Sequence, residues 1–156
     1  MKASLLYRIA CVILVLFAAG HTFGFLSFRP PTPEGLAVWN SMNHVHFQIS
    51  GTDYSYAGFY IAFGLTISFA QLLEAYLSWF LGRMANTAPQ AIAGLAWVFF
   101  LVQVAGLVLC CLYFGAIQIV FGSLVVACTG GGAWQVWRAN RQKSAAAAYT
   151  AALASR

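Results

Sequence analysis

Charged residues are scarce in this chain, and acidic residues are the scarcest of all. Charged side chains make up 7% of the 156 residues, with three acids against eight lysines and arginines, while 62% of the residues are hydrophobic. The mean hydropathy is +0.78, far above the value for a soluble domain. This composition excludes an ordinary soluble globular protein and indicates a membrane protein.

The chain also lacks the short motifs that identify common sites. Its four cysteines are Cys11, Cys110, Cys111 and Cys128, and none belongs to a Cys-x-x-Cys pair. We therefore expect no disulfide framework and interpret the cysteines as small apolar residues. No phosphate-binding loop, nucleophile elbow or His-Glu-x-x-His motif is present, so function has to be argued from single residues.

Four long apolar stretches occupy most of the sequence. They are residues 5–27, 56–81, 89–114 and 116–137. Each has about 20 residues or more, enough for a helix to cross a hydrocarbon core ~30 Å thick. We predict an all-α integral membrane protein, an antiparallel four-helix transmembrane bundle forming one domain over residues 1–156. A structured extracytoplasmic loop, 28–55, would join the first two helices, and an alanine-rich tail, 138–156, would follow the last.

The positions of the basic residues predict the topology. Seven of the eight lie before the first stretch or at its start, between the second and third, or after the fourth: Lys2, Arg8, Arg83, Arg138, Arg141, Lys143 and Arg156. Only Arg29 lies in the 28–55 loop, together with Glu34 and Asp53. By the positive-inside rule both termini are cytoplasmic and this loop is outside. The net charge of +5 is thus explained by a lipid bilayer as partner, and it does not indicate nucleic acid binding.

The 28–55 loop has its own local signals. Thr32 and Pro33 are typical of the N-cap and first position of a short helix, on which Trp39 would anchor the loop at the interface. Polar and apolar residues then alternate from His44 to Ser50. An extended segment would place His44 and His46 on one side, whereas a helix would send them to different faces.

Glu74 lies inside the second apolar stretch. A carboxylate in a bilayer core costs roughly 2.5–3.5 kcal/mol on insertion scales, so we expect it to face the bundle interior or a cavity. Helical spacing puts Gln71 and Tyr60 on the same stripe, and Gln103 and Gln118 add polar groups from the other helices. The alternative interpretation is that the glutamines only join helices by hydrogen bonds.

These residues support two kinds of function. The first is a binding protein that takes a small hydrophobic or lipid-like ligand in the bundle, or a structural subunit of a homodimer or larger membrane complex. Its predicted ligand-binding residues are Tyr60, Gln71, Gln103, Gln118 and Trp39, aromatic and polar groups of the kind that line ligand sites. The second is an intramembrane acid–base enzyme, similar in architecture to small isomerases, with Glu74 as the catalytic residue.

All three histidines of the chain are predicted to lie at one membrane face. His21 lies near the end of the first stretch, and His44 and His46 lie in the following loop. Three imidazoles can bind zinc or copper, and two can ligate haem iron. The alternative is that these histidines only cap helices and hydrogen-bond the loop. The sequence identifies no cofactor.

Two motifs carry a resemblance to a known family. The run Gly20-His21-Thr22-Phe23-Gly24-Phe25, followed by Arg29-Pro30-Pro31-Thr32-Pro33 and an aromatic start to the second stretch, resembles small bacterial membrane proteins with four spans and no assigned activity. The resemblance covers most of the chain up to about Arg83. It implies a bacterial inner-membrane location and the four-span plan, and it assigns no catalytic residue.

Overall fold

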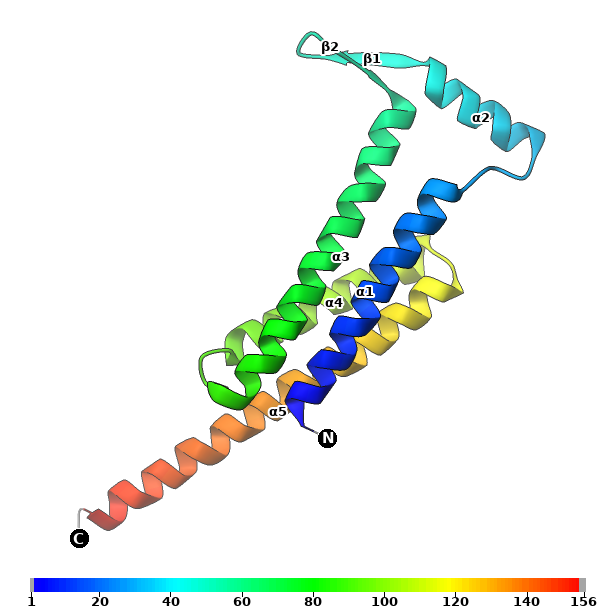
Figure 1. Ribbon diagram of the computed structural model, residues 1–156. Coiled ribbons are helices and arrows are strands. Elements are labelled where there is room, and N and C mark those ends of the chain that lie inside the picture. The colour runs from blue at the N-terminus through cyan, green and yellow to red at the C-terminus, as the bar shows by residue number, and fades with distance from the viewer. Residues whose placement is uncertain (1, 155–156) are drawn as a thin grey trace. The chain divides into compact units, whose positions relative to one another are not determined.

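The computed structural model describes residues 2–154, except for the side chains of residues 148 and 149. Its elements in chain order are α1 (Ala3–Ser27), α2 (Pro33–His44), β1 (His46–Ile49), β2 (Thr52–Ser55), α3 (Tyr56–Thr87), α4 (Ala93–Tyr113) and α5 (Ala116–Ala154) (Figure 1). Arg156, one of the predicted cytoplasmic cations, lies outside the described residues.

Four of these helices, α1, α3, α4 and α5, are long and apolar enough to cross a membrane. Within their most apolar windows only 11–22% of the residues are buried, so most of their hydrophobic side chains face outward. Phe69 and Leu73, for example, are 70% and 67% exposed. Such apolar outer surfaces are incompatible with water and match a lipid surrounding. The prediction of a helical membrane protein with four such helices is confirmed.

The connection between α3 and α4 differs from the expected one. We predicted helices over 56–81 and from Pro89 onward, whereas α3 continues to Thr87 and α4 begins at Ala93. Pro89 disfavours a helical conformation in the residue before it and offers no N–H, so α3 ends just before Ala88. A turn then fills the gap, and the Asn140 side chain holds it by donating to the Pro89 carbonyl oxygen at 3.1 Å.

Helix α5 also exceeds its predicted span of 116–137. It runs without a break through the alanine-rich tail to Ala154. No glycine or proline occurs between Ala133 and Ala154, and alanine has the highest helix propensity. The tail is therefore a continuation of the last apolar helix.

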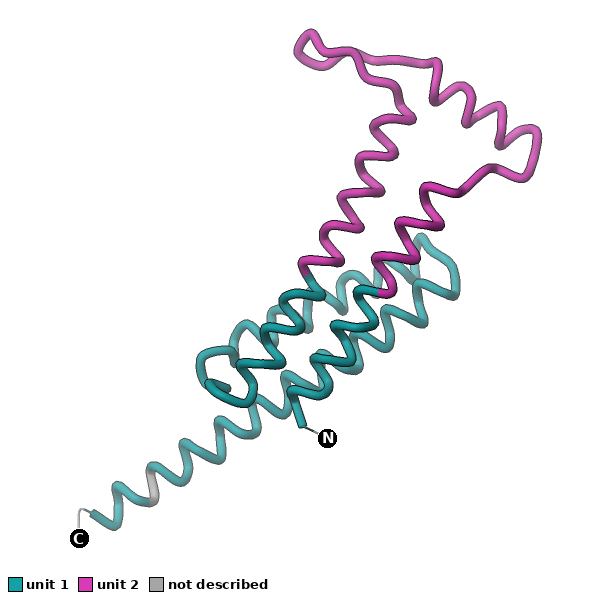
Figure 2. Tube along the Cα trace, in the orientation of Figure 1, with its two compact units in different colours: residues 1–15, 74–156 teal, residues 16–73 magenta. Residues whose placement is uncertain are grey.

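The fold divides into two compact units, one of residues 1–15 and 74–156 and one of residues 16–73 (Figure 2). We call them unit 1 and unit 2. Helices α1 and α3 contribute residues to both, whereas α4 and α5 belong to unit 1, and α2 and the two strands belong to unit 2.

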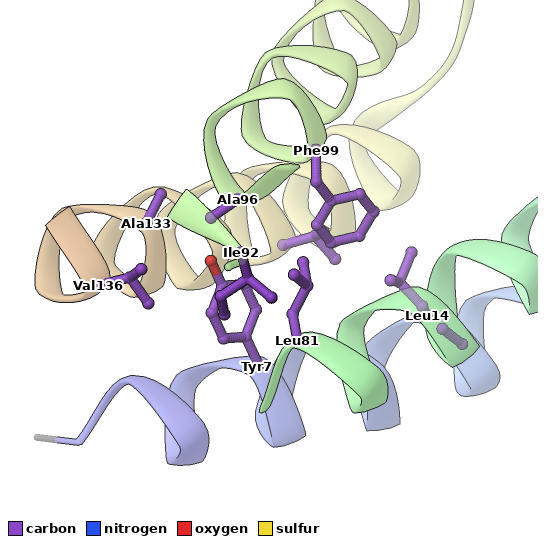
Figure 3. Packing of buried hydrophobic residues seen from close by; sticks show 10 residues of the cluster. Tyr7, Leu14, Leu81, Ile92, Ala96, Phe99, Ala133 and Val136 are labelled. Carbon is purple, nitrogen blue, oxygen red and sulfur yellow. The ribbon is translucent and has the colours of Figure 1, made fainter. Parts of the chain in front are cut away.

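Unit 1 has a core built from all four long helices (Figure 3). Its buried members are Tyr7, Leu14, Ala75, Leu81, Ile92, Ala96, Phe99, Val125, Ala133 and Val136. Small residues bring the helices close together. The hydroxyl of the fully buried Ser78 in α3 donates to the Tyr7 carbonyl oxygen in α1 at 2.8 Å. Side-chain hydrogen bonds of this kind are a usual link between membrane helices.

Helices α4 and α5 form a helical hairpin within unit 1. Glycines of α5 receive side chains of α4: an added Cβ at Gly122 would lie 3.2 Å from Leu107, and one at Gly130 would lie 2.7 Å from Phe100. Along these contacts the residue numbers in α4 fall while those in α5 rise, so the two helices run in opposite directions. The short connection around Gly115 requires this arrangement.

Unit 2 contains α2 and a two-stranded hairpin between its portions of α1 and α3. The Thr32 side chain accepts a hydrogen bond from the Gly35 N–H at 3.1 Å and Pro33 opens α2, which confirms the predicted cap. The strands pair antiparallel, with Ile49 opposite Thr52. The alternation predicted from His44 onward thus becomes a strand only at His46, because His44 still belongs to α2.

Candidate functional site

The most concentrated polar cluster within the apolar helices of unit 2 joins α1 to α3. The His21 Nδ1 atom lies 3.1 Å from the Ser68 hydroxyl oxygen, and the Thr22 and Ser68 hydroxyl oxygens are 2.7 Å apart. Thr22 also lies 2.8 Å from the Ala18 carbonyl oxygen. Ser68 is buried. We call His21, Thr22 and Ser68 the polar cluster.

The number of hydrogens in the polar cluster limits how it can be arranged. Each hydroxyl has one hydrogen, and a neutral imidazole carries one N–H. In one arrangement Thr22 donates to Ser68 and Ser68 donates to His21 Nδ1, which leaves Nε2 as a donor. In the other, His21 Nδ1 donates to Ser68, Ser68 donates to Thr22, and Thr22 donates to the Ala18 carbonyl. Nε2 is then an acceptor. Both arrangements leave the same atom, His21 Nε2, without a partner in the cluster.

An aromatic column extends from the polar cluster toward α2. The His21 ring stacks on Phe25 with centroids 5.7 Å apart and an interplanar angle of 4°. Phe25 contacts Tyr60 at 5.1 Å, and the Trp39 indole of α2 meets Tyr60 edge-on at 6.3 Å. Two residues predicted to bind ligand, Trp39 and Tyr60, are thus in contact with each other and connected to His21.

A glycine in α3 makes this column fit. An added Cβ at Gly64 would collide with the Phe25 ring, so Phe25 lies directly on the α3 backbone. Ser68 lies one turn further along α3 than Gly64, which places it next to α1. The positions of Phe25 and of the polar cluster therefore depend on the same close contact.

The other two histidines make their hydrogen bonds elsewhere in unit 2. His44 Nδ1 donates to the Asn40 carbonyl oxygen at 2.7 Å, a bond within its own helix. His46 Nδ1 pairs with the Asp53 carboxylate across the hairpin at 2.6 Å. Among residues 2–154, no three His, Cys, Asp or Glu side chains lie together in a way that could hold a metal ion. The structure does not bring His21, His44 and His46 to one site.

Glu74 has one of its predicted polar neighbours. In unit 1 its carboxyl interacts with the amide of the buried Gln103, although Gln103 Nε2 has no hydrogen bond of ordinary length and angle in the described structure. The contact is therefore loose. An acid–base role of Glu74 stays a prediction.

The remaining two glutamines differ in their surroundings. Gln71 belongs to unit 2, and its buried Oε1 has no hydrogen-bond partner among the described residues. Gln118 lies in the first turn of α5, where its Oε1 approaches Gly115. Their assignment to a ligand site stays a prediction.

Sequence reasoning missed Ser68 and Thr22 as members of a site. A signal for Ser68 was present, because it follows Gly64 by four residues and thus lies on the same stripe of α3 as Tyr60 and Gly64. The partners of Ser68 could not be predicted, because residue spacing within α3 does not determine which turn of α1 packs against Ser68.

Comparison with protein families, with curated proteins and with solved structures finds no match to this chain. The resemblance to small four-span bacterial membrane proteins therefore stays a prediction. Function has to be inferred from the geometry of the polar cluster and its surroundings.

Proposed function

We propose that this protein binds a small amphipathic, lipid-like molecule at the polar cluster, with the polar group of the ligand on His21 Nε2 and its apolar part along the aromatic column. One observation carries the proposal: the Nδ1 atom of His21, in a helix apolar enough to cross a membrane, is hydrogen-bonded to Ser68, which is bonded in turn to Thr22, while Nε2 has no partner in the polar cluster. Pockets for small ligands typically combine aromatic walls with a few fixed polar groups.

The free-energy cost of placing an imidazole among apolar membrane helices supports a ligand-binding role over simple helix packing. Polar groups that only join helices contribute on average about 0.6 kcal/mol, and Thr22 with Ser68 would suffice for that. An added imidazole is expensive among apolar helices and is by default a sign of function. Its fixed orientation, stacked on Phe25, is what a ligand contact requires, because an already ordered side chain loses little entropy on binding.

The proposal includes a membrane arrangement. We place the four long helices as an antiparallel bundle in a bacterial inner membrane, with both termini cytoplasmic and residues 28–55 outside. The distribution of lysine and arginine supports this orientation. Arg83 and Arg141 also lie over indole rings, of Trp79 at 5.0 Å and Trp137 at 4.6 Å, and tryptophan is enriched at membrane interfaces. The polar cluster would then lie in the outer half of the membrane.

Ligand retention tests the proposal. We expect protein purified in mild detergent to carry a small molecule detectable by native mass spectrometry, and Ser68→Ala to reduce its occupancy at least about fivefold, because His21 then loses its fixed orientation. Thr66→Ala is the matched control: among the described residues, its hydroxyl bonds to the Ala62 carbonyl oxygen of its own helix, at 2.9 Å.

The same measurement can contradict the proposal. A wild-type protein without any bound small molecule would refute ligand binding. Equal occupancy in Ser68→Ala and Thr66→Ala would place the ligand away from the polar cluster. Helicity by circular dichroism checks that both variants are folded.

A further inference from the structure

Helix α5 carries a depression where it changes from apolar to basic. The depression has a volume of about 450 Å³ and is lined by Trp134, Gln135, Arg138, Ala139 and Gln142. Residues four apart lie one above the other on a helix, so these side chains share one face over two turns. We call this the α5 depression. It belongs to unit 1, whereas the polar cluster belongs to unit 2.

The charge in the α5 depression is unopposed. The Arg138 side chain is exposed. The ion pair found in the described part of the chain joins His46 to Asp53 and does not include Arg138. The three acidic residues of the sequence all precede residue 75. Arg141, by contrast, lies 4.6 Å over the Trp137 ring. The N–H donors of the Arg138 guanidinium are therefore available to a ligand in the α5 depression.

The tryptophans indicate the depth of the α5 depression in the membrane. Trp134 is 53% exposed, and its ring lies 4.8 Å from that of Trp137. The sequence before Trp134 is apolar, and Arg138, Arg141 and Lys143 follow within the next nine residues. Exposed indoles followed by basic residues are typical of the headgroup level of a bilayer. This position favours a lipid headgroup as the source of an anion that binds here.

We propose that the α5 depression binds the headgroup of an anionic phospholipid. Arg138 offers a planar fork of donors that matches two phosphate oxygens. The amides of Gln135 and Gln142 line the same depression and donate to phosphate or glycerol oxygens. The Trp134 indole packs against the ester region and the first carbons of the acyl chains.

Lipid titration by native mass spectrometry tests this site. Full-length protein in detergent is titrated with phosphatidylglycerol and, separately, with zwitterionic phosphatidylcholine. We expect the first phosphatidylglycerol to bind more tightly than phosphatidylcholine, and Arg138→Gln to weaken it about fivefold, since this variant loses the charge-assisted hydrogen bonds of the guanidinium to the phosphate oxygens. Gln142→Ala tests the depression without a change of charge and is expected to weaken binding as well.

Lys143→Gln is the matched control, because it removes the same charge from an exposed residue outside the depression. It should change the affinity less than twofold. Equal losses in Arg138→Gln and Lys143→Gln would overturn the proposal in favour of diffuse attraction, and so would an Arg138→Gln protein that binds like the wild type. Inorganic phosphate, titrated in place of lipid, should not bind; binding that depends on Arg138 would assign the depression to free phosphate instead.

Discussion

Tyr7 illustrates how single residues determine the packing of unit 1. It is fully buried, although tyrosine is one of the bulkiest side chains, because glycines of two other helices face it. An added Cβ would lie 3.2 Å from the Tyr7 Cβ at Gly82 and 2.7 Å from its Cζ at Gly132. Between membrane helices, where lipid is as apolar as the protein, such close packing replaces the hydrophobic effect as the source of stability.

Gly132→Ala is expected to destabilise the protein. The new methyl group would overlap the ring of a side chain that has no free space, and overpacking of this kind typically costs about 1–3 kcal/mol. The measurement is thermal unfolding of the purified protein in detergent, followed by circular dichroism.

Gly106→Ala is the control for that prediction. A Cβ at Gly106 meets nothing within 4 Å, so alanine should be neutral or raise stability through its higher helix propensity, by up to about 1 kcal/mol. A Gly132→Ala protein as stable as Gly106→Ala would show that Tyr7 does not depend on Gly132.

At the scale of a single element, the turn between β1 and β2 shows how two residues determine a hairpin. Ser50 and Gly51, between the paired residues Ile49 and Thr52, have φ of 51° and 81°, the signs that a two-residue type I′ turn requires. An isolated two-stranded hairpin is at best marginally stable in water.

Aromatic packing supplies the missing support for the hairpin. Phe47 of β1 contacts Tyr54 across the hairpin at 5.9 Å, and Tyr56 and Phe59 of α3 at 4.8 and 5.7 Å. Such pairs contribute about 0.5–1.5 kcal/mol each beyond their buried area. Phe47 therefore packs the hairpin against the start of α3.

Gly51→Ala is expected to loosen the hairpin without affecting the helices. A non-glycine residue in the left-handed region costs roughly 1–2 kcal/mol, so amide hydrogen exchange over residues 46–55 should accelerate about five- to thirtyfold. Ser50→Gly is the matched control and should leave exchange unchanged or slower, because glycine adopts a positive φ freely. Unchanged exchange in Gly51→Ala would contradict the turn assignment.

At the scale of the whole molecule, the asymmetry of charge is the dominant feature. Of the basic residues only Arg29 lies in the segment between α1 and α3, whereas Arg83 lies near the end of α3 and all the others lie near the two ends of the chain. This distribution is a topology signal because cytoplasmic segments of membrane proteins are enriched in lysine and arginine.

Cysteine accessibility tests the proposed orientation. In a variant whose four native cysteines are replaced by alanine, Ser50→Cys in the hairpin should react with a membrane-impermeant maleimide on intact cells. Ser144→Cys, which lies in the basic part of α5, should react only after the membrane is permeabilised. The opposite pattern would reverse the orientation and place the polar cluster in the cytoplasmic half.

Local and compositional properties of this protein were determined by the sequence alone. Four apolar helices follow from length and hydropathy, because lipid requires every backbone polar group to be bonded within its own segment. The Thr32 cap of α2 follows from neighbouring residues. The register between helices has no such local origin. Because lipid and protein interior are equally apolar, hydrophobic periodicity does not mark the inward face of a membrane helix. That Ser68 meets His21 and that Gly132 meets Tyr7 was therefore decided by the tertiary structure, through shape and a few hydrogen bonds.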